Sequence, residues 1–218
     1  MIQRLIFEAL RQGMVHIAQD PTILDEIFVD NLGLGAEEVA AIKQLVRDTP
    51  PYPVHGYAQR DNTFPLWAIL LAGEQEADRY LADDAGIDTE EESDDLGADV
   101  TGSTWTHSYL VLNYGLSPAI CQYCYEIAKY ILITARRDLV NDYGFWNIAL
   151  SGADLAPDPR YFPEHMFIRQ LTVTVSSEYA AAVEGSKLGK AFRVAGIHVD
   201  RSGSASDAGP VKTLVTIG

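Results

Sequence analysis

The segment that decides the fold is Ser103–Tyr179, which reads STWTHSYLVLNYGLSPAICQYCYEIAKYILITARRDLVNDYGFWNIALSGADLAPDPRYFPEHMFIRQLTVTVSSEY. Within it, Trp105–Asn113 alternates two sets of side chains, which is typical of a strand. Pro118 can begin a helix, and Gly144 can end it. Between Pro118 and Gly144, apolar residues recur at helical spacing: Ile120, Cys124, Ile127, Ala128, Ile131, Ala135 and Leu139. The pattern therefore predicts a strand followed by one long amphipathic helix.

Two further strands are predicted after this helix, at Phe145–Ser151 and Met166–Ser177, with a wide loop rich in Pro and Asp at 152–164. In the last strand, Leu171, Val173 and Val175 alternate with polar residues. A shift of one residue would exchange its two faces, so the register is well specified. The polar, Thr-rich face suits a sheet that faces solvent or lines a lumen. These elements predict an α+β fold with a mostly antiparallel sheet packed by one long helix.

The residues before this segment predict helices and one buried strand. The first helix carries an apolar stripe that includes Leu5 and Leu10, Asp20-Pro21 begins a second helix, and Glu37 opens a third. Residues 50–63 are expected to form an extended connector. The apolar run Phe64–Ala72 predicts a strand that is buried on both faces or that packs against a helix. We expect a helical segment at 1–50, a core domain at 64–179 and a C-terminal arm or extra strands at 180–218.

Charge excludes one large class of function. The chain of 218 residues holds 31 acidic and 16 basic residues, which gives a net charge of −15. Proteins that bind nucleic acid neutralise phosphates with Lys and Arg, so direct reading of DNA or RNA is not expected. Neither a signal peptide nor a membrane span is expected, because the apolar runs are too short or carry charges.

An acidic stretch at 74–99 contains 12 acidic residues and a single basic one, Arg79. Mutual repulsion predicts a long exposed loop inserted in the core domain. Asp83, Asp84 and Asp88 leave a calcium site open as an alternative, although the order of ligands differs from that of an EF-hand. A small hydrolase or metal-dependent enzyme that uses this loop is therefore an alternative function. Metal that the wild-type chain retains after dialysis, and that a variant with all three residues mutated does not retain, would favour this alternative.

Other candidates for chemistry are weak. Cys121 and Cys124 form a CxxC pair that could serve redox chemistry, but they continue the apolar stripe of the long helix and are expected to be core residues of a protein from a reducing compartment. The five histidines form no spaced pair that predicts a metal site: His16, His55, His107, His165 and His198. No nucleotide-binding or nucleophile-elbow motif occurs. We therefore expect no enzyme activity, no metal and no cofactor.

The chain resembles the tail-terminator and neck proteins of long-tailed bacteriophages. The resemblance covers about Phe64–Ser177 and rests on the order strand, strand, long helix, strand, strand. Its most specific parts are FWNIALSGADL at 145–155, followed by a Pro/Asp loop and RQLTVTV at 169–175. The strand Phe64–Ala72 running into the acidic EQEAD at 74–78 is equally suggestive.

This resemblance implies a structural virion protein, assembled in the host cytoplasm, that forms a ring at the head–tail junction. The ring is expected to be a hexamer that caps the tail tube and joins it to the neck. A neck connector or stopper protein is the alternative, and a general cytosolic adaptor protein is another. An acidic inner wall would let DNA pass without specific binding. The last forty residues could pair with a neighbouring subunit. The residues expected at interfaces are Glu74, Glu76, Asp78, Asp83, Asp84, Asp154, Asp158, Arg160 and Arg169.

Overall fold

The structure is a computed structural model that describes residues 2–59, 62–82, 100–143, 145–155 and 166–182. The α+β fold class predicted from the sequence is confirmed, because helices are combined with a five-stranded, mostly antiparallel sheet. The elements run in the order α1 (Ile2–Gln19), α2 (Ile23–Asp25), the π-helix η1 (Glu26–Asp30), α3 (Ala36–Asp48), β1 (Tyr52–His55), β2 (Leu66–Ala82), β3 (Val100–Gly115), α4 (Pro118–Tyr143), β4 (Trp146–Leu155) and β5 (Phe167–Ala182).

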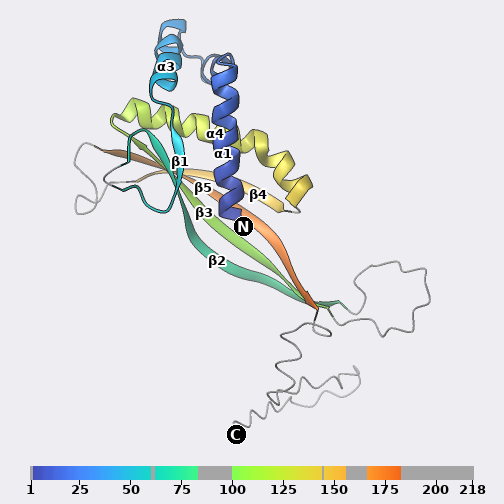
Figure 1. The fold of residues 1–218 in the computed structure, drawn as a ribbon. Helices are drawn as coiled ribbons and strands as arrows, with labels where there is room; N and C mark the ends of the chain where they lie inside the picture. Colours follow the sequence, from blue (N-terminus) through green and yellow to red (C-terminus); the bar gives the residue numbers. More distant parts are fainter. Residues whose placement is uncertain (1, 60–61, 83–99, 144, 156–165, 183–218) are drawn as a thin grey trace, which may run out of the picture. The chain divides into compact units, whose positions relative to one another are not determined.

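The strand order across the sheet is β1-β2-β3-β5-β4 (Figure 1). β1 runs parallel to β2, and β4 runs antiparallel to β5. The predicted order strand, strand, long helix, strand, strand is therefore confirmed for β2, β3, α4, β4 and β5. The chain separates into two compact units, residues 1–77 with 104–178, and residues 78–103 with 179–218. The second unit contributes, among its described residues, the end of β2, the start of β3 and the end of β5.

The main core of the first unit lies between the helices and one face of the sheet. Trp67 of β2, Val111 of β3 and Val173 of β5 are at most 1% exposed, and apolar residues of α1 and α4 pack on them. The Trp67 indole N–H donates to the backbone carbonyl of Cys124 in α4 at 3.2 Å. This bond satisfies a polar group that would otherwise be unpaired in the core. The predicted core face of β5 is thus confirmed.

The two long helices pack against each other at Gly13 of α1. A Cβ atom at this position would lie 2.6–2.7 Å from three side-chain atoms of Ile131 in α4. Glycine at position 13 therefore allows the helices to approach closely. α1 also contacts β1, so the N-terminal helix belongs to the same unit as the sheet.

The opposite face of the sheet carries a second, smaller core. It contains Leu66, Leu112, Tyr114 and Ile168, with Phe64 packed against it. Leu66, Trp67 and their two successors in β2 are all fully buried, which confirms burial on both faces for this part of the predicted strand, whereas Leu71 is 48% exposed. Burial raises the pKa of the Tyr114 hydroxyl to about 12. The remainder of this face bears the Thr-rich side chains of β5, which are half-buried.

Three predictions about the extent of the strands are wrong. Residues 52–55, expected in an extended connector, form β1, because the apolar start of β2 offers them a parallel partner. Residues 74–82, expected in an acidic loop, continue β2. Carboxylates are tolerated in this strand because side chains such as Glu74 and Asp78 remain exposed to water. The loop expected at 152–164 also begins later, since β4 extends to Leu155. The predicted C-terminal arm lies outside the described residues beyond Ala182.

Candidate functional site

The strand β4 forms one edge of the sheet, and within the described residues its strand neighbour is β5 alone. It is ten residues long, whereas strands typically have about five or six. Its register with β5 is continuous from the pair Ala149–Thr174 to the pair Leu155–Ile168. An irregularity near Asn147, whose φ is +51°, interrupts the pairing at the start of the strand. The result is a long edge with seven consecutive registered residues.

Charged side chains that would discourage pairing with another chain are scarce on this edge. The sequence of β4, WNIALSGADL, contains one charged residue, Asp154. Natural edge strands are commonly protected by Lys, Pro or a short length. On the side of β4 away from α4, the exposed residues include Ala149, Ser151 and Ala153, which are small. The backbone of this edge is therefore sterically accessible.

Asp154 and Arg169, both expected at an interface, form an ion pair across β4 and β5. Arg169 Nε lies 3.0 Å from Asp154 Oδ1, and the Arg169 guanidinium lies 4.6 Å from the centre of the Tyr125 ring. Buried Asn113 donates to the backbone carbonyl of Arg169 at 2.9 Å. These contacts hold Arg169 beneath α4, while the Asp154 side chain stays 80% exposed. Asp154 is thus the member of the pair that a neighbouring molecule can reach.

Gly152 is required beside this pair. A Cβ atom at position 152 would overlap the hydroxyl oxygen of Tyr125. The Tyr125 side chain therefore packs directly on β4. This contact fixes the position of the Tyr125 ring, over which the Arg169 guanidinium lies.

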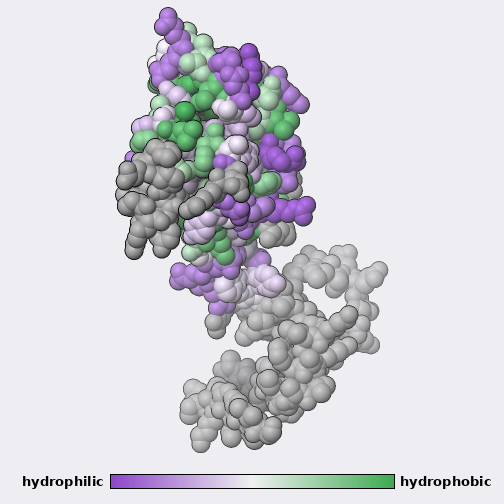
Figure 2. Space-filling model, turned by 60° about the vertical axis from the view of Figure 1, so that its left-hand side comes forward, coloured by the Kyte–Doolittle hydropathy of each residue, from purple (hydrophilic) through white to green (hydrophobic). Residues whose placement is uncertain are grey.

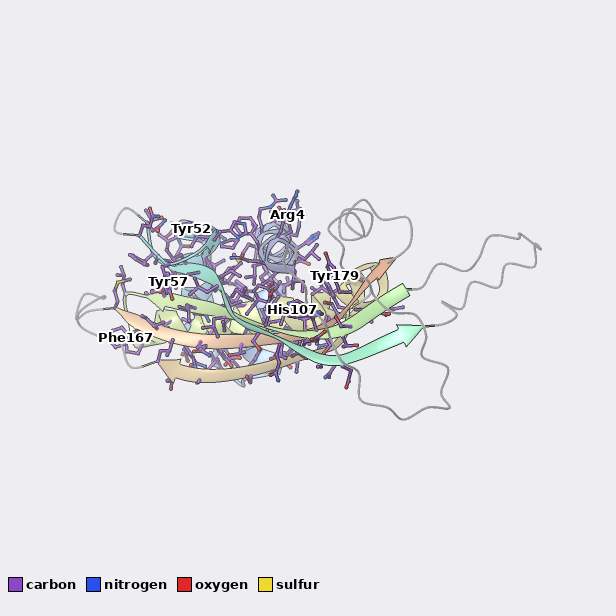
Figure 3. The ribbon with its side chains drawn as sticks, turned by 90° about the horizontal axis from the view of Figure 1, so that it is seen from below. Arg4, Tyr52, Tyr57, His107, Phe167 and Tyr179 are labelled. Carbon is purple, nitrogen blue, oxygen red and sulfur yellow. The ribbon has the colours of Figure 1, made fainter. Side chains whose placement is uncertain are left out.

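Exposed apolar residues lie next to the β4 edge. Leu155 and Phe167 are 37% and 39% exposed, and both line a hollow of about 310 Å³ beside Arg169. Tyr57 is 69% exposed and lies at the same end of the sheet as Phe167 (Figure 3). Aromatic side chains are enriched at protein–protein interfaces, where they add apolar area at a low entropic cost. This end of the sheet combines an open edge with exposed aromatic groups.

A second polar arrangement joins the three adjacent strands β2, β3 and β5. His107 Nδ1 lies 3.1 Å from Glu74 Oε1, and His107 Nε2 lies 2.8 Å from Ser177 Oγ. Glu74 was expected at an interface, but the structure also shows it as a partner of His107. Burial, followed by the charge of Glu74, raises the pKa of the neighbouring Tyr109 hydroxyl. His107 lies away from the end marked by Tyr57 and Phe167 (Figure 3).

No local sequence pattern predicts this arrangement of Glu74, His107 and Ser177. In the sequence, His107 is 33 positions from Glu74 and 70 positions from Ser177. The alternation in Trp105–Asn113 did place His107 on the same side as buried Tyr109 and Val111, and a histidine on a covered face requires hydrogen-bond partners.

Of the other residues expected at an interface, some lie in the described part of the chain and some lie outside it. Glu76 and Asp78 lie on β2, half-buried and exposed respectively. Asp83, Asp84, Asp158 and Arg160 lie outside the described residues, as does the alternative calcium site. In the part of the chain that is described, no three His, Cys, Asp or Glu side chains form a group that could hold a metal ion.

The CxxC pair is confirmed as part of the core. Cys121 and Cys124 are buried free thiols, and the Cys121 thiol donates to the carbonyl of Asn113 at 3.2 Å. Burial raises the pKa of Cys121 to about 11 and that of Cys124 to about 12. Reactive redox cysteines have lowered pKa values, so this environment opposes a thioredoxin-like role.

An apolar groove lies between α1 and the C-terminal half of α4. Its volume is about 620 Å³, and its lining includes Leu5, Ala9, Ile131 and Leu139, with Glu8 among the polar residues. Over the helical part of the molecule, apolar and hydrophilic residues are interspersed on the face drawn in Figure 2. No described helix has the length and apolar character of a transmembrane segment.

Comparison of the chain with protein-family models and with curated protein sequences gives no match.

Proposed function

We propose that this chain is a structural protein that assembles with copies of itself, and that the β4 edge is a contact between copies. The observation that carries this proposal is the long edge strand with a single charged residue, Asp154. An unpaired edge presents a row of backbone N–H and C=O groups to a partner chain. The small residues on β4 and exposed Leu155 and Phe167 add a surface that a second copy can cover.

A contact of this kind can generate a ring. If the β4 edge meets a different surface on the next copy, the interface is heterologous, and a rotation that closes produces a cyclic assembly. Asp154 is 80% exposed and is available to a basic group on the neighbour. A ring of chains that each carry a net charge of −15 would present an acidic wall.

For the identity of this ring, we propose the tail terminator of a long-tailed bacteriophage. The order of β2, β3, α4, β4 and β5 supports this proposal. The net negative charge also supports it, because an acidic wall disfavours binding of the DNA that passes through a ring. In this role a hexamer would cap the tail tube and face the neck. The alternative in the same class is a neck connector or stopper. The two differ in their partner, since a terminator should bind assembled tail tubes and a stopper should bind the head-side ring.

The β4 contact can be tested with paired charge variants. Ser151→Lys combined with Ala153→Lys adds two positive charges on exposed positions of β4, and lysine discourages edge pairing. Ala40→Lys combined with Ala41→Lys adds the same charge on exposed positions of α3. Size-exclusion chromatography with light scattering should show that the β4 variant is a folded monomer and that the α3 variant matches the wild type. Equal oligomer masses for all three proteins would refute a β4 contact.

A further inference from the structure

Ser177, His107 and Glu74 have the connectivity of a nucleophile, a base and an orienting carboxylate. Ser177 Oγ lies 2.8 Å from His107 Nε2, and Glu74 Oε1 lies 3.1 Å from His107 Nδ1. Each group comes from a different strand, and the three strands β5, β3 and β2 are neighbours in the sheet. Since β-strands hold side chains on rigid backbone, the spacing of the three groups is fixed by the sheet.

The hydrogen-bond partners determine which imidazole nitrogen carries the proton. A carboxylate accepts hydrogen bonds and cannot donate one, so Glu74 requires a proton on His107 Nδ1. In the neutral ring, Nε2 is then an acceptor, and the Ser177 hydroxyl donates to it. This is the tautomer that a general base needs to take a proton from a serine hydroxyl.

We propose that Ser177 is a nucleophile that accepts acyl groups from activated esters. In the first step, Ser177 Oγ attacks the acyl carbon, His107 Nε2 takes the hydroxyl proton, and the bond between the acyl carbon and the leaving oxygen breaks. The leaving group departs as an alcohol that takes this proton from His107, or as a stabilised anion, in which case His107 releases the proton to solvent. In the second step, His107 removes a proton from water, which attacks the acyl carbon. The bond between the acyl carbon and Ser177 Oγ then breaks, the carboxylic acid leaves, and His107 returns the proton to the Ser177 oxygen. Ser177 and His107 are the catalytic residues, and Glu74 is a positioning residue.

The substrate class follows from the groups that the three strands supply. A good leaving group such as p-nitrophenolate departs without a proton from a general acid. A nucleophile with an oriented base is therefore sufficient for acyl transfer from activated esters. The Glu74 side chain is 41% exposed and that of His107 is 13% exposed, so small reagents can reach the edge of the arrangement.

The experiment uses the full chain, a fluorophosphonate probe and p-nitrophenyl acetate. With the probe, Ser177 Oγ displaces fluoride from phosphorus, and peptide mass spectrometry identifies the labelled serine. Ser176→Ala is the matched control, because consecutive residues of a strand point to opposite faces of the sheet. We expect Ser177→Ala to abolish both the label and the burst of p-nitrophenolate, and Ser176→Ala to retain both.

Glu74→Gln distinguishes positioning from a purely structural bridge between strands. The glutamine amide can donate to His107 Nδ1 and thereby favour the wrong tautomer. The labelling rate should fall about a hundredfold or more, in the range of general-base catalysis, while the fold is retained. Failure of the wild-type chain to label, equal labelling of Ser177→Ala, or a Glu74→Gln variant with the wild-type rate would overturn the proposal.

This activity does not depend on ring formation, because all three side chains belong to one chain. A monomeric protein that labels at Ser177 would contradict the proposed assembly and support the serine chemistry. A ring that does not label would do the reverse.

Discussion

Gly13 and Ile131 offer a test of helix packing. The effect of Gly13→Ala on the free energy of unfolding should change sign when Ile131 is replaced by alanine. In an exposed helix interior, Gly→Ala increases stability by about 1 kcal/mol, because alanine has the higher helix propensity. At position 13, however, the added Cβ would lie 2.6–2.7 Å from three atoms of Ile131. Ile131 is 6% exposed and β-branched, so its side chain has little freedom to move away. Overpacking of this kind typically costs about 1–3 kcal/mol.

The two effects oppose each other, and the clash should prevail. We expect Gly13→Ala to lower the free energy of unfolding by up to about 2 kcal/mol in the wild-type background. Ile131→Ala alone should cost about 2–5 kcal/mol, as for other large-to-small core changes. In that second background the clash is absent, so Gly13→Ala should increase stability by about 1 kcal/mol.

Urea unfolding followed by circular dichroism of the four proteins in this cycle gives the coupling free energy directly. A coupling of about 1–3 kcal/mol is expected between positions 13 and 131. If Gly13→Ala stabilised both backgrounds equally, the close approach of α1 and α4 at Gly13 would be refuted.

Three further predictions concern the sheet and the cysteines. Val173→Asp should abolish soluble expression, because the residue is 1% exposed and an unpaired buried charge costs several kcal/mol; normal folding would show that β5 is misassigned. Gly152→Ala should destabilise by about 1–3 kcal/mol, and much less in a Tyr125→Ala background that lacks the clashing hydroxyl and ring; equal losses in urea unfolding would argue against that contact. The pKa values of Cys121 and Cys124, about 11 and 12, exceed the value of about 8.5 for an unfolded thiol. Because the thiols of the unfolded chain lose their protons at lower pH, the free energy of unfolding should fall as the pH rises from about 9 to 11. The double alanine variant should lose this part of the pH dependence in urea unfolding, and an unchanged dependence would contradict it.

The periodicity of apolar residues was sufficient to predict the fold class. In β5, strict alternation around Val173 specified the buried face, and helical spacing identified the 26-residue helix α4. Both signals depend on burial against a single large core, so local sequence carries them.

Strand ends and pairings were harder to predict. The acidic residues from Glu74 to Asp78 suggested a solvated loop, but an exposed strand keeps such side chains in water just as well. The strand β1 has four residues that include Pro53, and it is stabilised by a parallel partner rather than by its own pattern. Propensity in strands depends strongly on such neighbours.

The candidate sites could be predicted in part. Asp154 and Arg169 were named as interface residues, which stays a prediction, and the register of β4 with β5 pairs them with each other. The bridge of Glu74, His107 and Ser177 required the order β2-β3-β5, which local patterns do not specify. Contacts between residues far apart in sequence follow from topology, so the sequence alone could indicate their burial but not their geometry.

Native mass spectrometry of the full chain over a range of concentrations tests self-assembly most directly. We predict one dominant oligomer of fixed copy number that appears as a closed ring in negative-stain electron micrographs. A monomer that persists throughout the concentration range would contradict assembly through the chain's own surfaces.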